Sequence, residues 1–220
     1  MNPVRKMVLL VGLSAASLAG AAPPPPMDLE ISYYTKVVTD EGVTREANYK
    51  ERMLRRAGHV WVARELPAGA ASRKAAHGLN PAVLPRHVRL EGGRMVLEIV
   101  DTALKAVVAI APSEFANVGF DGSWEAAYSL ADPARVAQLP LSIRSSAIPG
   151  AQWREREKDG LFERVLWDAA RQVALVVESG DAGGRFFRRV QAVPVSPSRA
   201  TLPWEQLRSY AQREYADYLD

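Results

Sequence analysis

Residues 28–55 read DLEISYYTKVVTDEGVTREANYKERMLR, and their pattern decides the fold. In the first half, apolar Ile31 and Tyr33 alternate with more polar neighbours, which is the two-residue period of a β-strand. Residues 39–42 are turn formers, and an alternating segment follows at 43–55. We therefore predict two antiparallel strands that are joined as a hairpin.

The second strand of this hairpin is polar on both faces. Thr44 and Glu46 alternate with Arg45 and Ala47, and neither row is apolar enough for both sides of the strand to be buried. Part of the sheet is therefore expected to face water or to form an edge.

Strand patterns separated by glycine turns continue along the chain. Asp159 and Gly160 are typical of a two-residue hairpin turn, whereas residues 67–86 are rich in Pro and Gly and predict a long surface connection. Together with the first hairpin, the segments that follow make roughly ten predicted strands: residues 59–66, 87–91, 95–100, 105–111, 140–145, 151–158, 161–168, 172–179 and 185–193.

Three segments favour helices. Ser123 is a suitable N-cap for a short helix over residues 124–130, and Asp132 followed by Pro133 begins another that ends near Gln138. After Pro203, spacings of three and four predict a C-terminal helix over residues 203–219 that covers the sheet with one face. That face consists of Trp204, Leu207, Ala211, Tyr215 and Tyr218.

These segments indicate a mainly β fold. We expect an antiparallel meander of about ten strands that forms a curved sheet or half-open barrel, with short helices after residue 112 and the C-terminal helix. Residues 28–220 would form this single domain, after a proline-rich spacer at 22–27. The architecture resembles the half-barrel of periplasmic lipoprotein carriers, although no sequence motif of that family is present.

The N-terminus has the pattern of a signal peptide. Arg5 and Lys6 precede an apolar run over residues 7–18, and small residues follow up to Ala21, after which we expect cleavage. The run is shorter than the ~20 residues of a transmembrane helix, and no later segment is apolar for long enough to span a bilayer. The mature protein is therefore expected in the periplasm or secreted.

Composition limits the chemistry and the partners. The chain has no cysteine, which excludes disulfides, thiol catalysis and lipid attachment at a cysteine. Without residues 1–21, basic and acidic side chains are nearly balanced, so nucleic acid is not an expected partner.

No catalytic or metal-binding motif stands out. His59, His77 and His87 are the only histidines and are too dispersed to predict a metal site. The stretch 119–123 has the wrong residue order for a hydrolase nucleophile turn. The carboxylates of Asp121 and Glu125 are one helical turn apart, a spacing that is common on solvated surfaces. We expect no enzyme activity, no metal and no cofactor.

Aromatic and arginine side chains on the predicted strands are candidates for a binding surface. Aromatic rings hold apolar groups, and arginines bind carboxylate or phosphate. The candidate ligand-binding residues are Tyr33, Trp61, Arg64, Trp153, Arg164 and Trp167, and the candidate lid residues are His77, Phe120 and Trp124. A simpler explanation is that the arginines pair across strands with Glu51, Glu155, Glu157 and Glu163.

Two roles remain open. The favoured hypothesis is an exported, non-enzymatic protein that holds an apolar or amphipathic, lipid-like ligand or an extended peptide in its curved sheet. The alternative is an accessory protein of a bacterial envelope complex, with a protein partner and no small ligand. A partly empty interior would favour the first role, and a filled interior with an exposed aromatic patch the second.

Overall fold

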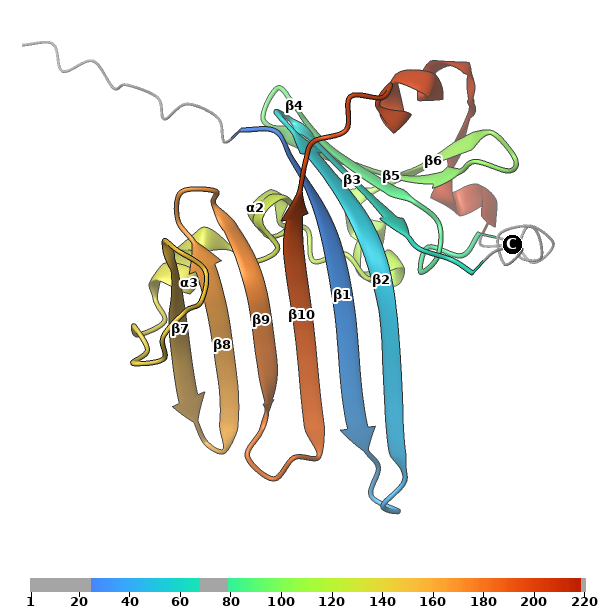
Figure 1. The fold of residues 1–220 in the computed structure, drawn as a ribbon. Coiled ribbons are helices and arrows are strands. Elements are labelled where there is room, and N and C mark those ends of the chain that lie inside the picture. Colours follow the sequence, from blue (N-terminus) through green and yellow to red (C-terminus); the bar gives the residue numbers. More distant parts are fainter. Residues whose placement is uncertain (1–24, 68–78, 219–220) are drawn as a thin grey trace, which may run out of the picture.

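The computed structural model describes residues 25–67 and 79–218 (Figure 1). The predicted signal peptide, half of the predicted spacer (residues 22–24) and His77 lie outside the described residues. The described chain forms one sheet of eleven strands. Their bounds are β1 Met27–Val38, β2 Thr44–Arg56, β3 His59–Arg64, β4 Arg86–Glu91, β5 Arg94–Asp101, β6 Ala106–Ile110, β7 Ala151–Lys158, β8 Leu161–Asp168, β9 Val173–Asp181, β10 Phe186–Val195 and β11 Ala211–Glu214.

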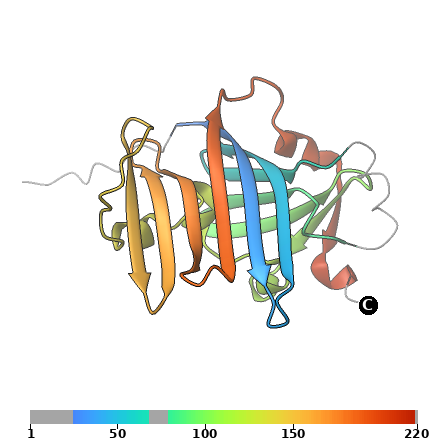
Figure 2. The same cartoon turned by 60° about the horizontal axis from the view of Figure 1, so that its bottom comes forward.

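The strand order is β11-β6-β5-β4-β3-β2-β1-β10-β9-β8-β7, and β7 and β11 lie at opposite edges. All neighbours are antiparallel except β11 and β6, which are parallel. The sheet curls around residues 112–138 (Figures 1 and 2). We call the face that this segment covers the inner face and the opposite one the outer face. The predicted mainly β, curved and open architecture is confirmed.

Local sequence signals explain the hairpins. In the β7–β8 turn, Asp159 and Gly160 both have positive φ, 54° and 73°, which this turn type requires. In the β1–β2 hairpin the second strand follows the turn that ends at Gly42. Tyr33 of β1 pairs with Tyr49 of β2. Residues 44–48 of β2 are exposed, as their polar pattern predicts.

The segment on the inner face consists of short helices. The two α-helices begin where they were predicted, since the side chains of Ser123 and Asp132 accept hydrogen bonds from the backbone N–H groups of Ala126 and Ala134, respectively. Two single 3₁₀ turns precede these helices. The elements are η1 Pro112–Glu114, η2 Ala116–Val118, α2 Trp124–Ser129 and α3 Pro133–Ala137.

The predicted strand at 140–145 is wrong. This segment makes one isolated bridge, between Leu141 and Arg154 of the neighbouring edge strand β7, and the amide of Ser142 donates to the carbonyl of Trp153. Leu141 and Ile143 are exposed, so their alternation produces no buried face that would hold a strand in register.

The predicted C-terminal helix over 203–219 is also wrong. The segment forms the 3₁₀ helix η3 Pro203–Ser209, then strand β11, then the 3₁₀ turn η4 Tyr215–Tyr218. Its apolar residues do not share one face, because Trp204 and Leu207 pack on the outer face while Tyr215 packs against the main core. The backbone of 211–214 instead extends the sheet beside β6. Non-local pairing has overridden the helical spacing.

Two apolar layers hold the sheet. The main core lies on the inner face, where Leu29, Met53, Val60 and Val88 are buried together with Phe115 of the covering segment. A second cluster lies on the outer face and contains Leu54, Trp61, Val100, Val107 and Leu207. Within residues 25–67 and 79–218, no helix is long and apolar enough to cross a membrane.

Candidate functional site

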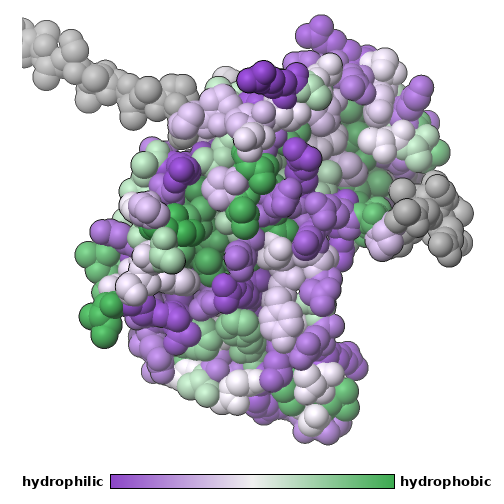
Figure 3. All heavy atoms as spheres, in the orientation of Figure 1, coloured by the Kyte–Doolittle hydropathy of each residue, from purple (hydrophilic) through white to green (hydrophobic). Residues whose placement is uncertain are grey.

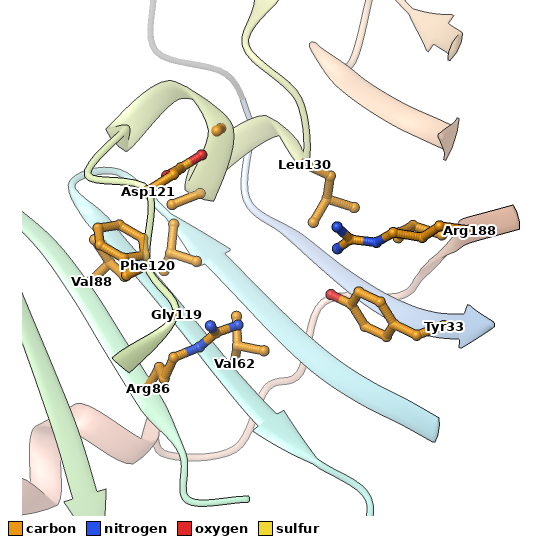
Figure 4. Close-up of a pocket in the computed structure, with 13 residues that line it drawn as sticks. Tyr33, Val62, Arg86, Val88, Gly119, Phe120, Asp121, Leu130 and Arg188 are labelled. Carbon is orange, nitrogen blue, oxygen red and sulfur yellow. The ribbon is translucent and has the colours of Figure 1, made fainter. Parts of the chain in front are cut away.

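A cavity of about 320 Å³ lies between the inner face of the sheet and the covering segment (Figure 4). We call it the inner pocket. Valines of β3, β4 and β10 line its sheet side, and residues 119–130 line the opposite wall. The lining residues are Tyr33, Val60, Val62, Arg86, Val88, Gly119, Phe120, Asp121, Ala126, Ala127, Leu130, Arg188 and Val190.

Strand alternation brings the sheet residues to this wall. Val60 and Val62 are two apart on β3, and Val88 pairs directly with Val60, so all three side chains point to the same face. Val190 pairs with Tyr33 on β1. The result is an apolar surface that spans four strands in space.

Turn geometry shapes the opposite wall. Gly119 ends η2 with φ 70°, a left-handed conformation that favours glycine. The next residue, Phe120, packs edge-to-face on Phe115, with ring centroids 5.3 Å apart. Phe120 is thereby anchored to the main core while one side of it lines the inner pocket.

Leu130 ends α2 with φ 62° and ψ −3°, a left-handed conformation that is strained for a branched side chain. Its side chain packs against two core clusters, the main one and a cluster beneath α3. These contacts hold the strained backbone, and they place Leu130 in the wall of the inner pocket.

A second cavity of about 350 Å³, the side pocket, adjoins the inner pocket and shares Asp121, Ala126 and Leu130 with it. Val165 and Val177 line its sheet side. At its edge Arg135 and Glu163 form an ion pair at 3.3 Å. The helix α2 therefore separates two partly empty compartments on one face of the sheet.

Arginine and tyrosine side chains gather at one end of the inner pocket. Tyr33 and Tyr49 stack with their ring centroids 4.5 Å apart, and the guanidinium of Arg64 lies 4.0 Å from the centre of the Tyr49 ring. Arg86 and Arg188 line the pocket at this end, close to Tyr33 (Figure 4).

A buried carboxylate lies beside this group. Glu51 is 8% exposed, and its Oε2 has no hydrogen-bond partner and lies 3.9 Å from a guanidinium nitrogen of Arg86. Burial raises the pKa of the Tyr33 hydroxyl well above its ordinary value, and the negative charge of Glu51 raises it further. Tyr33 therefore keeps its proton at neutral pH and can donate a hydrogen bond.

The structure brings together only some of the residues that the sequence singled out. Tyr33 and Phe120 line the inner pocket, and Arg64 lies beside it on Tyr49. Trp124 contacts Tyr128, with ring centroids 5.1 Å apart, and is not part of the pocket wall. His77 lies outside the described residues.

The remaining candidates lie elsewhere. Trp167 packs beneath α3, against the cluster that contains Val136 and Leu139. Trp61, Trp153 and Arg164 face the outer side of the sheet. Trp61 is buried there beneath the C-terminal segment, so the candidate tryptophans do not lie together on the inner face.

Two outer-face arginines form ion pairs across strands, and of their partners only Glu155 was among the glutamates that the simpler explanation named. Arg164 lies 3.5 Å from Glu155 and 4.0 Å from Glu178, and Arg189 lies 3.2 Å from Glu178. Arg144 stacks over Trp153 at 4.8 Å. These contacts lie on the outer face of the sheet. Because successive side chains of a strand point to opposite faces, Arg164 points away from the inner pocket.

Sequence reasoning missed two residues of the arginine and tyrosine group. Tyr49 lies in the polar strand β2, and Arg86 begins β4 after a connection that was expected to extend through it. The hairpin register would have revealed Tyr49, because a residue paired with Tyr33 must share its face. No local signal places Arg86 beside it.

Comparison with known proteins gives a distant likeness. No protein-family model and no curated protein matches the sequence. Among solved structures, PNGF-II matches with a TM-score of 0.41 and 9% identity, over 87% of this chain and 32% of that one. The MucA/MucB complex of Pseudomonas aeruginosa matches with a TM-score of 0.37 and 11% identity, over 82% of this chain and 55% of that one.

A LolA superfamily protein from Nitrosomonas europaea matches with a TM-score of 0.36 and 10% identity, over 84% of this chain and 90% of that one. This chain thus spans about a third of the length of PNGF-II and about half of the MucA/MucB chain. These TM-scores are low, and the function proposed below rests on the pocket itself.

His59 and His87 form a pair on the outer face. Nδ1 of His59 lies 3.0 Å from Nε2 of His87, and Nδ1 of His87 lies 2.9 Å from the Glu98 carboxylate. Trp204 stacks on both imidazole rings, with centroids 5.1 and 5.5 Å away. Among the described residues, no group of three potential ligands could hold a metal ion.

This pair predicts a loss of stability in mild acid. Burial lowers the pKa of His59, and the nearby His87 and Arg89 lower it further. The unfolded chain therefore binds a proton near pH 6.5 that the folded protein accepts only at lower pH. The free energy of unfolding should fall as the pH drops from about 6.5 to the folded pKa, which urea unfolding at several pH values would measure.

The variant His59→Gln provides the control, because glutamine removes the titrating group. Its unfolding free energy should change less over this pH window than that of the wild type. An equal pH slope in both proteins would contradict the assignment to His59.

Proposed function

We propose that the protein is a non-enzymatic binding protein of the space outside the cytoplasm, and that it holds an apolar or amphipathic, lipid-like ligand in the inner pocket. The observation that carries this proposal is the pocket's construction. Valines of three strands face Phe120 and Leu130 across a cavity of about 320 Å³, a volume within the usual range of ~300–1,000 Å³ for ligand sites.

The pocket's walls support an apolar occupant. Val60 and Val88 are buried, while Phe120, Ala126, Ala127 and Leu130 are half-buried and leave apolar surface toward the cavity. A ligand that covers this surface removes it from water, which stabilises the complex. The export pattern of residues 1–21 supports the compartment.

Filling the cavity tests this proposal. Ala126 lines both compartments, so Ala126→Trp should place an indole where the ligand would lie. We expect the affinity for Nile red, an uncharged apolar dye, to fall at least about tenfold, because the occupied volume is no longer available. Fluorescence titration measures the affinity, and circular dichroism checks that the variant is folded.

Ala116→Trp is the matched control. Ala116 belongs to the same covering segment but is exposed and does not line the cavity, so its replacement should leave dye binding unchanged. Equal binding by the wild type and the folded Ala126→Trp variant would overturn the assignment of the inner pocket.

A second candidate is an accessory protein that binds a partner chain through its outer face. Tyr34, Phe187 and Phe162 form a half-exposed aromatic row there, with successive ring centroids 6.0 and 6.3 Å apart. Gly180 makes room for Phe162, since a Cβ at this position would lie 2.7 Å from its ring. The outer face over these strands is mixed in hydropathy (Figure 3).

Native mass spectrometry of the mature protein, purified from its own envelope, separates the two candidates. A co-purifying small amphiphile supports the binding function. A stoichiometric polypeptide without any small molecule supports the accessory role instead.

A further inference from the structure

The arginine and tyrosine group at one end of the inner pocket has no role in holding an apolar chain. Arg86 and Arg188 line this end together with Tyr33. Arg64 lies beside them, because its guanidinium stacks on Tyr49, which in turn stacks on Tyr33. Three cationic side chains therefore surround one pair of tyrosine rings.

We propose that this group is a subsite for an oxyanion, and that the ligand of the inner pocket is an amphiphile with a carboxylate or phosphate head. This inference rests on the binding function proposed above and specifies the chemical class of its ligand. The apolar walls would hold the chain, and the arginine and tyrosine group would bind the head.

The local charges favour an anion. Glu51 is the carboxylate that lies among the three arginines, and its contact with Arg86, at 3.9 Å, is too long for a hydrogen bond. Asp121 on the opposite wall already accepts a hydrogen bond from the amide of Ser123. The guanidinium of Arg86 therefore retains donors that are directed at no acceptor within hydrogen-bond distance among the described residues.

Arg188 is the best placed of the three. It is exposed on β10, lines the cavity, and forms no ion pair within the described part of the chain. Its guanidinium points toward the space between Leu130 and Tyr33 (Figure 4). A guanidinium can donate two parallel hydrogen bonds to a carboxylate or phosphate.

The geometry separates head from chain. Val60, Val62 and Val88 line the pocket on β3 and β4, next to Arg86, whereas Tyr33 and Arg188 belong to β1 and β10 at its other side. A ligand that satisfies both ends must be apolar along most of its length and anionic at one end.

The test compares ligands with one chain and different heads. Decanoate, decyl phosphate, decanol and decyltrimethylammonium would compete with Nile red at pH 7.5, below their micelle concentrations. We expect the two anions to bind at least about tenfold more tightly than decanol, because each charge-assisted hydrogen bond favours them. The anion that binds more tightly identifies whether the natural head is a fatty-acid carboxylate or a phosphate.

Arg188→Gln should remove most of this preference, because the affinity for the two anions should fall far more than the affinity for decanol. Arg94→Gln is the matched control, because Arg94 is exposed and outside the cavity, and it should retain the full preference. Arg86→Gln gives a second measurement, read together with its thermal unfolding because it leaves the buried Glu51 without its nearest cation.

The outcomes distinguish the oxyanion subsite from the proposed binding function on which it rests. Equal binding of all four compounds, abolished by Ala126→Trp, would overturn the oxyanion subsite and leave the binding function standing. Tighter binding of the cationic compound would also overturn it. If none of the compounds or the dye binds, both proposals fail.

Discussion

Replacing Arg55 with methionine should lower the free energy of unfolding by about 3–5 kcal/mol. Arg55 is fully buried. Its guanidinium donates hydrogen bonds to three backbone carbonyls, those of Tyr128 at 3.2 Å, Arg171 at 2.7 Å and Gln172 at 3.0 Å.

The position of these carbonyls explains the size of the effect. Tyr128 belongs to α2, and Arg171 and Gln172 belong to the turn between β8 and β9. Arg55 on β2 therefore joins the covering segment and a distant hairpin to the centre of the sheet. Methionine preserves much of the side-chain volume but removes the donors to all three carbonyls. The hydrogen bond to Tyr128 is buried and those to Arg171 and Gln172 are partly buried, and a buried group left unsatisfied costs about 1–3 kcal/mol.

Urea unfolding measures this change, with Arg45→Met as the matched control. Arg45 lies on the same strand but is exposed, so its replacement should change the unfolding free energy by no more than about 0.5 kcal/mol. Similar values for the two variants would show that the carbonyl contacts of Arg55 do not stabilise the fold.

Replacing Trp61 with alanine should cost about 3–5 kcal/mol of stability and leave ligand binding unaffected. Trp61 is 6% exposed and packs with Leu54, Val100 and Leu207 in the outer cluster. Alanine would leave a cavity that the rigid strands cannot close. Since Trp61 faces away from the inner pocket, the folded variant should bind Nile red with wild-type affinity.

Phe120→Ala is the converse variant. Phe120 is half-buried and lines the inner pocket, so its truncation should weaken dye binding and cost less stability than Trp61→Ala. Calorimetric unfolding and dye titration of both variants provide the comparison. If the folded Trp61→Ala variant loses as much dye affinity as Phe120→Ala, the assignment of a purely structural role to Trp61 would be contradicted.

The elements that sequence reasoning predicted correctly are those with local causes. The hairpin turn at Asp159 and Gly160 and the helix starts at Ser123 and Asp132 depend on neighbouring residues only. These predictions did not require knowledge of which strands pair.

The errors arose where distant segments compete for the same residues. Residues 203–219 have helical spacing, yet 211–214 pair with β6 and the flanking aromatic residues divide between two clusters. The candidate tryptophans illustrate the same limit. Their strands were identified, but alternation does not indicate which face becomes concave or which is covered by the C-terminal segment.

The sequence by itself therefore determined most of the strands, the turns, the helix caps and the absence of thiol chemistry, because each follows from residue identity and short-range spacing. Only the tertiary structure decided that Tyr33, Arg86 and Arg188 meet beside an apolar pocket and that Trp61 lies outside it. The physical reason is that curvature and the long-range pairing of strands bring residues of β1, β4 and β10 to one wall, and no local pattern encodes that meeting.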